Sequence, residues 1–334
     1  MNKKQKVVMQ DIADRLSISK NSVSQALSGK DGVSEETKMK ILQTADEMGY
    51  QYKKKQVSGA NAPTKTIGLI ASEFAFSMKN FFGEIYLSIE REAQKNGITL
   101  MIQSVSPSMR DRLIMPSFIQ DGSVDGIFIL SHISTEYIKQ VIAQDIPSVL
   151  IDHHHPLLLS DAVLTNNRFG AYMAVKHLLD LGHRKIGLIG NIDASPSYLE
   201  RWEGYILAMR EHDAAVNQEH VFVDVIEDET RIDTVVRSIE QQPDAWFCLN
   251  DGFGYYVCSS LKALGYRIPE QIAICGFDNT HFSQMCIPKL TTMDIDIPFF
   301  AHKAFSQLLW RMQNPDEVYQ EVLLPTALVK REST

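Results

Sequence analysis

The sequence predicts a small all-α domain at the N-terminus, followed by a larger α/β core of two doubly wound parallel-sheet lobes. Two patterns support this prediction. Residues 8–50 contain three short amphipathic segments with apolar residues at helical spacing. From residue 66 onwards, short apolar runs alternate with amphipathic segments, which is typical of parallel strands covered by helices. A chain of 334 residues is also long enough to bury more than one hydrophobic core.

The first two N-terminal segments lie close enough together to form a helix-turn-helix. The first covers residues 11–16, and the second begins at Lys20, directly after the suitable N-cap residue Ser19. A third segment follows at residues 35–48 and ends at Gly49. The apolar positions of the first two segments would share one small core, and they are Ile12, Ala13, Leu16, Val23, Ala26 and Leu27.

The second of these helices would present polar side chains outward at its start and one turn later. They are Ser19, Lys20, Asn21, Ser22 and Gln25. A helix that opens with hydrogen-bond donors and amides, supported by a shorter helix before it, suits the major groove of DNA. Any small three-helix domain has similar spacing, so periodicity alone leaves a purely structural domain as an equal alternative.

The distribution of charge favours DNA binding. Residues 1–58 hold 11 Lys and Arg against 7 Asp and Glu, a net charge of +4. The remaining residues therefore carry −12, which gives the whole chain its net charge of −8. Because the acidity lies outside the N-terminal domain, it does not argue against a nucleic-acid partner.

An ordered series of motifs runs from the N-terminal helices to the last residue. It comprises Gln10-Asp11-Ile12-Ala13, residues 19–24, Leu27, Val33-Ser34, Thr37, Phe81-Phe82, Glu84, Asp125-Gly126, residues 182–186, Arg201, Gly204-Tyr205, Asn250-Asp251, Ile268-Pro269, residues 276–279, residues 290–292 and residues 329–334. In this order they resemble the lactose repressor/galactose repressor (LacI/GalR) family of transcriptional regulators. The resemblance implies a headpiece that binds double-stranded operator DNA, a core like the type I periplasmic binding proteins, and a homodimer formed through that core.

With this resemblance, the chain divides into a headpiece at residues 1–58, a linker at 59–65 and an effector-binding and dimerisation core at 66–334. The linker is rich in small residues and contains a helix breaker, Pro63. The basic residues at the end of the headpiece are Lys53, Lys54 and Lys55. They would neutralise DNA phosphates, or form a solvated charged segment without a partner.

The chain departs from the family at this basic stretch. Relatives usually form a short hinge helix here, which enters the minor groove and wedges a leucine between base pairs. Tyr52-Lys53 replaces the usual Pro-Asn start, and Gly59 falls at the wedge position. Phosphate contacts are therefore expected here, and intercalation is not.

The core is expected to contain two series of alternating strands and helices. The first has strands at 66–71, 98–105, 126–130 and 148–151, and a helix at 82–96. The second has helices at 170–181, 201–212 and 233–241, and strands at 185–190, 221–225 and 245–249. Two such series suggest two lobes that face one cleft. By resemblance, residues 290–297 cross back to the first lobe, which gives a first lobe of about 66–165 and 290–320 and a second of about 166–289 and 321–334.

The residues after the predicted strands are rich in carboxylates and amides, which match the hydroxyl groups of a sugar. By resemblance, Asp152, Arg201, Asn250 and Asp278 occupy the positions that hold the effector in sugar-responsive relatives. Aromatic side chains can supply an apolar face for a sugar ring. The complete predicted effector set is Ser72, Phe74, Asp152, Arg201, Trp202, Asn250 and Asp278.

Some of these residues also have a purely structural interpretation. Asn250-Asp251 and Asp278-Asn279 can cap the helix or turn that follows them, and for Asp251 and Asn279 this role is at least as strong an alternative as ligand contact. The family usually has a glutamine three residues after Leu-Thr-Thr, where Ile295 stands here. Any sugar preference that depends on that glutamine is not expected in this chain.

Other functional classes find little support in the sequence. The run His153-His154-His155 lacks the spacing of a metal site, and the four cysteines share no ligand spacing, so no metal or cofactor is expected. There is no phosphate-binding loop, nucleophile elbow or Rossmann glycine triplet. No apolar run is long enough to span a membrane, which predicts a cytoplasmic protein without a membrane partner. The remaining alternative is a sugar-binding receptor, or a sugar-processing enzyme that pairs Asp152 with Asp278.

These observations together predict a DNA-binding transcriptional regulator, most simply a repressor, and not an enzyme. A small-molecule effector, a sugar or sugar derivative, would bind between the two lobes and control the affinity for the operator.

Overall fold

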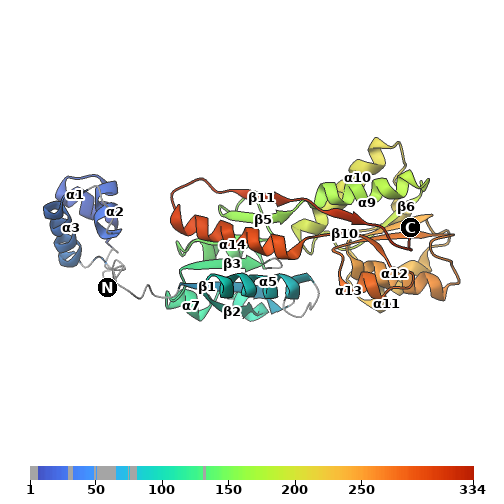
Figure 1. The fold of residues 1–334 in the computed structure, drawn as a ribbon, viewed down its shortest axis with the longest axis horizontal. Coiled ribbons are helices and arrows are strands. Elements are labelled where there is room, and N and C mark those ends of the chain that lie inside the picture. Colours follow the sequence, from blue (N-terminus) through green and yellow to red (C-terminus); the bar gives the residue numbers. More distant parts are fainter. Residues whose placement is uncertain are drawn as a thin grey trace. The chain divides into compact units, whose positions relative to one another are not determined.

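The computed structural model describes residues 7–28, 33–48, 50, 65–73, 75, 81–130 and 133–334, and of Ser28 and Glu35 only the backbone. The chain divides into two compact units, Met1–Pro63 and Thr64–Thr334, each shown with its helices and strands in Figure 1.

The first unit is a three-helix domain. Its helices are α1 (Met9–Leu16), α2 (Lys20–Ser28) and α3 (Glu35–Glu47). Ser17 adopts a left-handed conformation with φ of 54°, which turns the chain between α1 and α2. The hydroxyl of Ser34 accepts a hydrogen bond from the Thr37 amide (3.3 Å) and caps α3. The fully or nearly buried apolar side chains come from all three helices and are Ile12, Ala13, Val23, Ala26, Leu27, Ile41 and Ala45. The predicted N-terminal helix-turn-helix is confirmed.

The first lobe of the second unit is built on a six-stranded sheet with the order β11-β5-β4-β3-β1-β2, in which all neighbours are parallel. Its strands are β1 (Thr66–Ser72), β2 (Thr99–Val105), β3 (Gly126–Leu130), β4 (Ser148–Ile151), β5 (Asp161–Thr165) and β11 (Glu321–Leu324). Its helices are α5 (Phe81–Lys95), α6 (Pro107–Asp111), α7 (Ser117–Gln120), α8 (Thr135–Ile142) and α14 (Ile297–Gln313). The central strands β3 and β4 are buried along their whole length, as expected for parallel strands covered on both faces.

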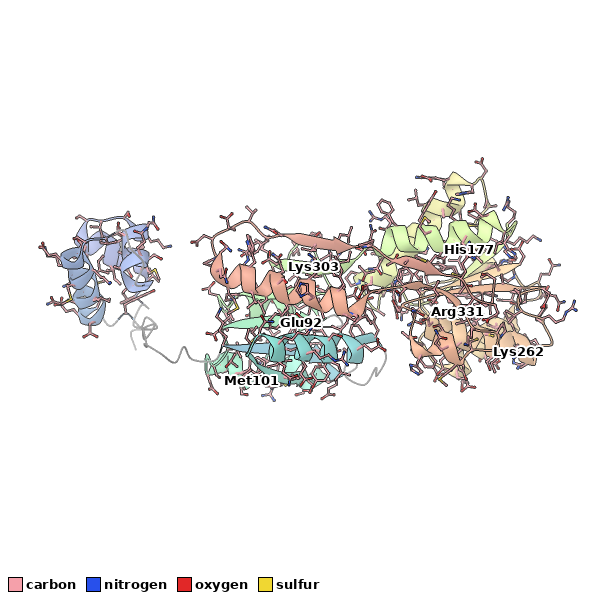
Figure 2. All side chains as sticks on the ribbon, in the orientation of Figure 1. Glu92, Met101, His177, Lys262, Lys303 and Arg331 are labelled. Carbon is pink, nitrogen blue, oxygen red and sulfur yellow. The ribbon has the colours of Figure 1, made fainter. Side chains whose placement is uncertain are left out.

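Helices α5 and α14 lie side by side on this sheet (Figure 1). Glu92 of α5 and Lys303 of α14 are labelled in Figure 2 on these neighbouring helices. The carboxylate of Glu92 is 3.0 Å from Nδ1 of His302, which links the two helices at their surface. Both helices bury apolar side chains in the core of this lobe, where Phe305 of α14 packs against Phe128 of β3.

The second lobe has a six-stranded sheet with the order β12-β10-β9-β8-β6-β7. Its strands are β6 (Ile186–Ile189), β7 (Val221–Phe222), β8 (Ala245–Cys248), β9 (Ala273–Phe277), β10 (Thr291–Asp294) and β12 (Ala327–Val329), of which β12 is antiparallel to β10. Its helices are α9 (Asn167–Asp180), α10 (Pro196–Glu211), the 3-10 turn Gln218–His220, α11 (Glu229–Ser238), α12 (Asp251–Ala263) and α13 (His281–Met285). The predicted fold class, with two parallel-sheet lobes, is confirmed.

Helices α9 and α10 approach each other closely. A Cβ atom on Gly204 would lie 2.1 Å from the backbone oxygen of Arg168, so only glycine fits at this crossing. This contact holds the first turns of α10 beside α9, and α10 carries the buried side chain of Arg201.

The predicted lobe boundaries near the C-terminus are wrong for two strands. Residues 290–297 were expected to belong to the first lobe, but β10 pairs with β9 and β12 in the second sheet. Residues 321–334 were expected in the second lobe, but β11 pairs with β5 in the first sheet. The physical reason is side-chain fit: Thr291 and Thr292 of β10 are fully buried and bond to groups of the second lobe, among them Asp251. The chain therefore crosses between the lobes after β5, after β10 and after β11.

None of the described helices combines the length and the apolar character that crossing a lipid bilayer requires.

Candidate functional sites

Helix α2 of the first unit is amphipathic in the way the sequence predicts. Val23, Ala26 and Leu27 point into the core of the domain. Ser19, Lys20 and Asn21 are exposed, while Ser22 and Gln25 are partly exposed. The structure thus places the predicted DNA-contacting residues on one helix, at its start and one turn later. Lys53, Lys54 and Lys55 lie outside the described residues.

The first turn of α2 has groups that suit the binding of an anion. The hydroxyl of Ser19 accepts the Ser22 amide hydrogen (3.0 Å), and the two hydroxyl oxygens lie 2.9 Å apart. The first turn of α2 contains Lys20 and no acidic residue. A helix N-terminus with exposed donors and a cation is a suitable contact for a DNA phosphate, and it would fix the orientation of the helix on the duplex.

In the second unit, a cavity lined by polar and aromatic side chains lies between the two lobes and has about 470 Å³ of empty space, including the part open to solvent. The first lobe contributes the start of α5 and the residue after β4. The second lobe contributes the start of α10, the segment before α11, the start of α12 and the residues after β9. The lining residues are Phe81, Phe82, Asp152, Ser195, Ser197, Tyr198, Arg201, Glu227, Asn250, Asp251, Gly252, Asp278, Thr280 and Phe282.

Arg201 is the centre of the polar network in this cavity and is only 1% exposed. Its Nε donates to Oδ1 of Asn167 (2.9 Å), its Nη1 to the carbonyl oxygen of Leu249 (2.6 Å), and its Nη2 to Oδ1 of Asp278 (2.7 Å). The guanidinium also lies 3.8 Å from the centroid of the Phe277 ring, a cation–π distance. Three hydrogen bonds and a ring face fix this cation in one orientation.

Two carboxylates face this part of the cavity. Burial raises the pKa of Asp278, and the Arg201 guanidinium counteracts part of that rise. Burial also raises the pKa of Asp152 to about 7, against the opposing effect of Arg201 and with the added repulsion of Asp278. Asp152 is only 4% exposed, and its Oδ1 has no hydrogen-bond partner within the protein. A buried carboxylate oxygen without a donor is costly, so a ligand that brings a donor would be favoured here.

Asn250 organises the opposite side of the cavity. Its Oδ1 accepts the Phe253 amide hydrogen (2.9 Å) and caps α12, which confirms the capping role considered from the sequence. Its Nδ2 donates to both Oε2 of Glu227 (2.6 Å) and the hydroxyl oxygen of Tyr198 (2.6 Å). The amide of Asn250 is thus fully used within the protein. Glu227 and Tyr198, which Asn250 positions, offer their polar atoms to the cavity instead.

Asp251 and Asn279 have structural partners. Asp251 accepts hydrogen bonds from Thr292 Oγ1 (2.6 Å) and from the Thr280 amide (2.6 Å), and burial raises its pKa to about 8. Asn279 donates to Asp294 (2.7 Å) and accepts from Arg331 (2.5 Å). These contacts support the interpretation that the two residues mainly shape the turns at the cleft.

The other predicted effector residues lie elsewhere. The Ser72 hydroxyl accepts the Ala75 amide hydrogen (3.1 Å) at the end of β1, and Trp202 packs against the apolar core. Neither is among the described residues that line the cavity. Phe74 lies outside the described residues. Among the described residues of the predicted set, the cavity therefore unites Asp152, Arg201, Asn250 and Asp278.

Tyr198 and Glu227 are cavity residues that the sequence did not reveal. The signal for Tyr198 was present, because Ser195-Pro196 is a helix start that places α10 five residues before its predicted beginning. Glu227 follows a two-residue strand in a loop, and no local pattern marks it.

Within the histidine run, His154 contacts two carboxylates. Its Nε2 lies 2.8 Å from Glu200 of α10 in the second lobe, and its Nδ1 lies 3.2 Å from Glu321 of β11 in the first. Among the described residues, no group of three His, Cys, Asp or Glu side chains is arranged to hold a metal ion. The four cysteines are buried thiols.

His154 should make the stability of the core depend on pH. The hydrogen bond to Glu200 is the main cause that raises the pKa of His154 to about 9. Because this exceeds the unfolded value of about 6.5, the contact stabilises the fold fully below about pH 6.5 and is lost as pH rises through about 9. We expect the melting temperature to fall less steeply from about pH 7 to about pH 9.5 in His154→Gln than in the unmodified protein.

The control for this experiment is His281→Gln, which makes the same substitution at an exposed position away from Glu200 and Glu321. The cleft carboxyls titrate in all three proteins, so the difference between the curves isolates His154. Parallel curves for His154→Gln and the unmodified protein would show that the contact has no energetic role.

Comparison with known proteins gives the family. The sequence model for bacterial regulatory proteins of the lacI family matches residues 8–52, and that for a periplasmic binding protein-like domain matches residues 175–334. The chain is 28% identical over 332 residues to the HTH-type transcriptional repressor PurR of Vibrio vulnificus (97% of this chain, 98% of that protein). It is 29% identical over 328 residues to the ribose operon repressor of Haemophilus influenzae (97% and 98%).

Solved structures agree with this result. A LacI family transcriptional regulator from Enterococcus faecium with bound ribose superimposes with a TM-score of 0.69 and is 26% identical, covering 81% of this chain and 98% of that one. The N-terminal match, the core match and relatives that span the whole chain together show that the protein is a member of the LacI family of transcriptional regulators, with a DNA-binding helix-turn-helix domain and a periplasmic-binding-protein-like core.

Proposed function

We propose that the protein is a cytoplasmic repressor that binds a two-fold operator as a homodimer, and that a small molecule in the cavity between the lobes controls its affinity for the operator. The observation that carries this proposal is a cavity with polar and aromatic side chains from both lobes, in a chain that also has a helix-turn-helix domain. The relatives named above are repressors, and the Enterococcus regulator was solved with ribose, which supports a sugar or sugar derivative as the effector.

The mechanism follows from where the cavity residues reside. Asp152 belongs to the first lobe, whereas Arg201, Asn250 and Asp278 belong to the second. A ligand that bonds to both sets favours the arrangement in which the lobes are closer, and it shifts the population towards that arrangement. Two headpieces of a dimer must match half-sites about 34–36 Å apart, so a small change in the cores can alter their register on DNA.

Gln25 should contact a base, while Lys54 should contact a phosphate. We expect Gln25→Ala to weaken binding to the operator by about 1–3 kcal/mol and to relax the preference at one base pair, because a base contact carries sequence information. Lys54→Ala should weaken binding to operator and random DNA alike and reduce the salt dependence. Fluorescence anisotropy with operator and scrambled duplexes at several salt concentrations measures both effects.

The matched control is Gln43→Ala, the same chemical change on the exposed surface of α3. It should leave both affinities unchanged. Equal losses on operator and scrambled DNA for Gln25→Ala would exclude a base contact by this residue.

A further inference from the structure

The cavity between the lobes is rich in carboxyl groups. Four carboxylates line it: Asp152, Glu227, Asp251 and Asp278. Among the described residues of the lining, Arg201 is the one cation, and its Nη2 already donates to Asp278 (2.7 Å). If all four acids were ionised, the lining would have a net charge of −3, but burial raises the pKa of each of them, so some of them are protonated near neutral pH. A cationic ligand would favour their ionised forms. An anionic ligand such as a sugar phosphate would add repulsion in a site shielded from water.

Several hydrogen-bond donors of the cavity lining are already engaged within the protein, whereas one buried acceptor has no partner there. Both hydrogens of the Asn250 amide go to Glu227 and Tyr198. Arg201 donates from all three of its nitrogens to groups of the second lobe. In contrast, Oδ1 of Asp152 is buried without a donor. A ligand that supplies a donor would therefore satisfy Asp152, and a positive charge on it would offset the excess of carboxyl groups.

Glu227 is a lining carboxylate that two neighbouring residues hold in place. It reaches the lining from the loop before α11, where Asn250 fixes Oε2 at 2.6 Å. A Cβ atom on Gly252 would lie 1.9 Å from Glu227 Oε1, so the glycine at the start of α12 provides the space for this carboxylate. The N-terminus of α12 also favours a negative charge beside it. Burial raises the pKa of Glu227 to about 7, as expected for an acid with too little compensating charge.

Aromatic rings complete the lining, with Phe81 and Phe82 from the first lobe and Tyr198 and Phe282 from the second. Such rings favour the apolar face of a sugar and can also attract an ammonium group. Resting on the proposed function, we propose that the effector is an amino sugar or a similar polyol with a protonated amine, and that Glu227 is the residue that selects the amine. Asp152 accepts a second hydrogen bond from the same ligand.

The test compares matched ligands on the full chain by thermal shift. The probes are glucosamine, galactosamine and mannosamine, each beside its neutral parent sugar and its uncharged N-acetyl form, with glucose 6-phosphate as the anion. We expect one amino sugar to stabilise the protein at a concentration at least about ten-fold lower than its parent or N-acetyl form, because only the amine gains a charge-assisted hydrogen bond.

Two variants test whether Glu227 causes the preference for the amine. Glu227→Gln removes the charge and keeps the shape, while Gly252→Ala keeps the charge but displaces the flexible end of Glu227. Both should reduce the preference for the amine to roughly two-fold or less. The control Glu229→Gln removes one charge at the exposed start of α11 and should keep the full preference.

The proposal is overturned if no amino sugar stabilises the protein, if the parent sugar or glucose 6-phosphate binds as well as the amine, or if Glu227→Gln keeps the preference. These results are distinguishable from failure of the repressor function. If a neutral sugar stabilises the core and also alters operator binding, the proposed effector-controlled repressor stands, and only the proposed preference for an amine is wrong. Loss of operator specificity would appear separately in the Gln25 experiment, which needs no effector.

Discussion

Replacing Arg201 with methionine should destabilise the core by about 3–5 kcal/mol, since one partner of a buried ion pair is then left alone. Asp278 is only 8% exposed and would lose its only cation among the described residues within 4 Å. Leu249 and Asn167 would each lose a donor as well. The same variant should lose stabilisation by any ligand of the cavity, because the guanidinium orients Asp278 for it.

The effect of Arg201→Met should also depend on pH. Burial raises the pKa of Asp278 and Arg201 opposes that rise, so the pKa should rise further in the variant. A carboxyl whose folded pKa is raised costs stability above its unfolded pKa, and the cost disappears once both states are protonated. The deficit should therefore be smaller at about pH 5 than at about pH 8.

Urea denaturation of the core at both pH values measures these differences. Arg210→Met is the matched control, because Arg210 lies exposed in the last turn of the same helix and should change stability by less than about 0.5 kcal/mol. Adding Asp278→Asn to Arg201→Met should recover part of the loss. A deficit of less than about 1 kcal/mol, or one that is the same at both pH values, would contradict the buried-pair argument.

The parts of this fold that the sequence predicted best are those with a strong local signal. Strands β3 and β4 begin and end where their continuous apolar runs do, at Gly126–Leu130 and Ser148–Ile151. In the helix-turn-helix domain, helical periodicity and the cap residues Ser19 and Ser34 fixed the three helices. Local patterns suffice where burial and capping depend on neighbours in the sequence.

The errors concern contacts between distant segments. The sequences of β10 and β11 predict strands, but they contain no pattern that predicts which of the two sheets each strand joins. The cavity has the same limit. The family resemblance placed Asp152, Arg201, Asn250 and Asp278 in it. Glu227 lines the cavity because Asn250 bonds to its carboxylate and Gly252 leaves space for it. Such positions depend on side-chain packing over tens of residues, which no short motif encodes.

Arg311 is a second buried cation, and Arg311→Met should also destabilise the core by about 3–5 kcal/mol. Its Nε and Nη2 donate to the two carboxylate oxygens of Asp161 (2.5 and 3.1 Å), at the start of β5. Arg311 is 3% exposed and Asp161 is fully buried. The guanidinium also donates to carbonyl oxygens of the segment that leads from α14 to β11, at Glu317 (2.7 Å) and Val318 (2.9 Å).

This arrangement gives Arg311 two separable roles, as the counter-ion of Asp161 and as the anchor of the segment before β11. Asp161→Asn removes the charge but keeps a carbonyl oxygen that can accept from Gln320. The backbone amide of Gln320 donates to Asp161 Oδ1 (2.8 Å). If the unpaired charge is the main cost, the double variant Arg311→Met/Asp161→Asn should be more stable than Arg311→Met alone when measured by urea denaturation. If anchoring is the main role, the double variant should be no more stable, and the segment before β11 should become sensitive to proteolysis.

The exposed Arg231→Met should match the unmodified protein in both assays. A loss below about 1 kcal/mol for Arg311→Met would contradict both roles, because a cation with six acceptor atoms in the protein cannot be removed from a buried site at so small a cost.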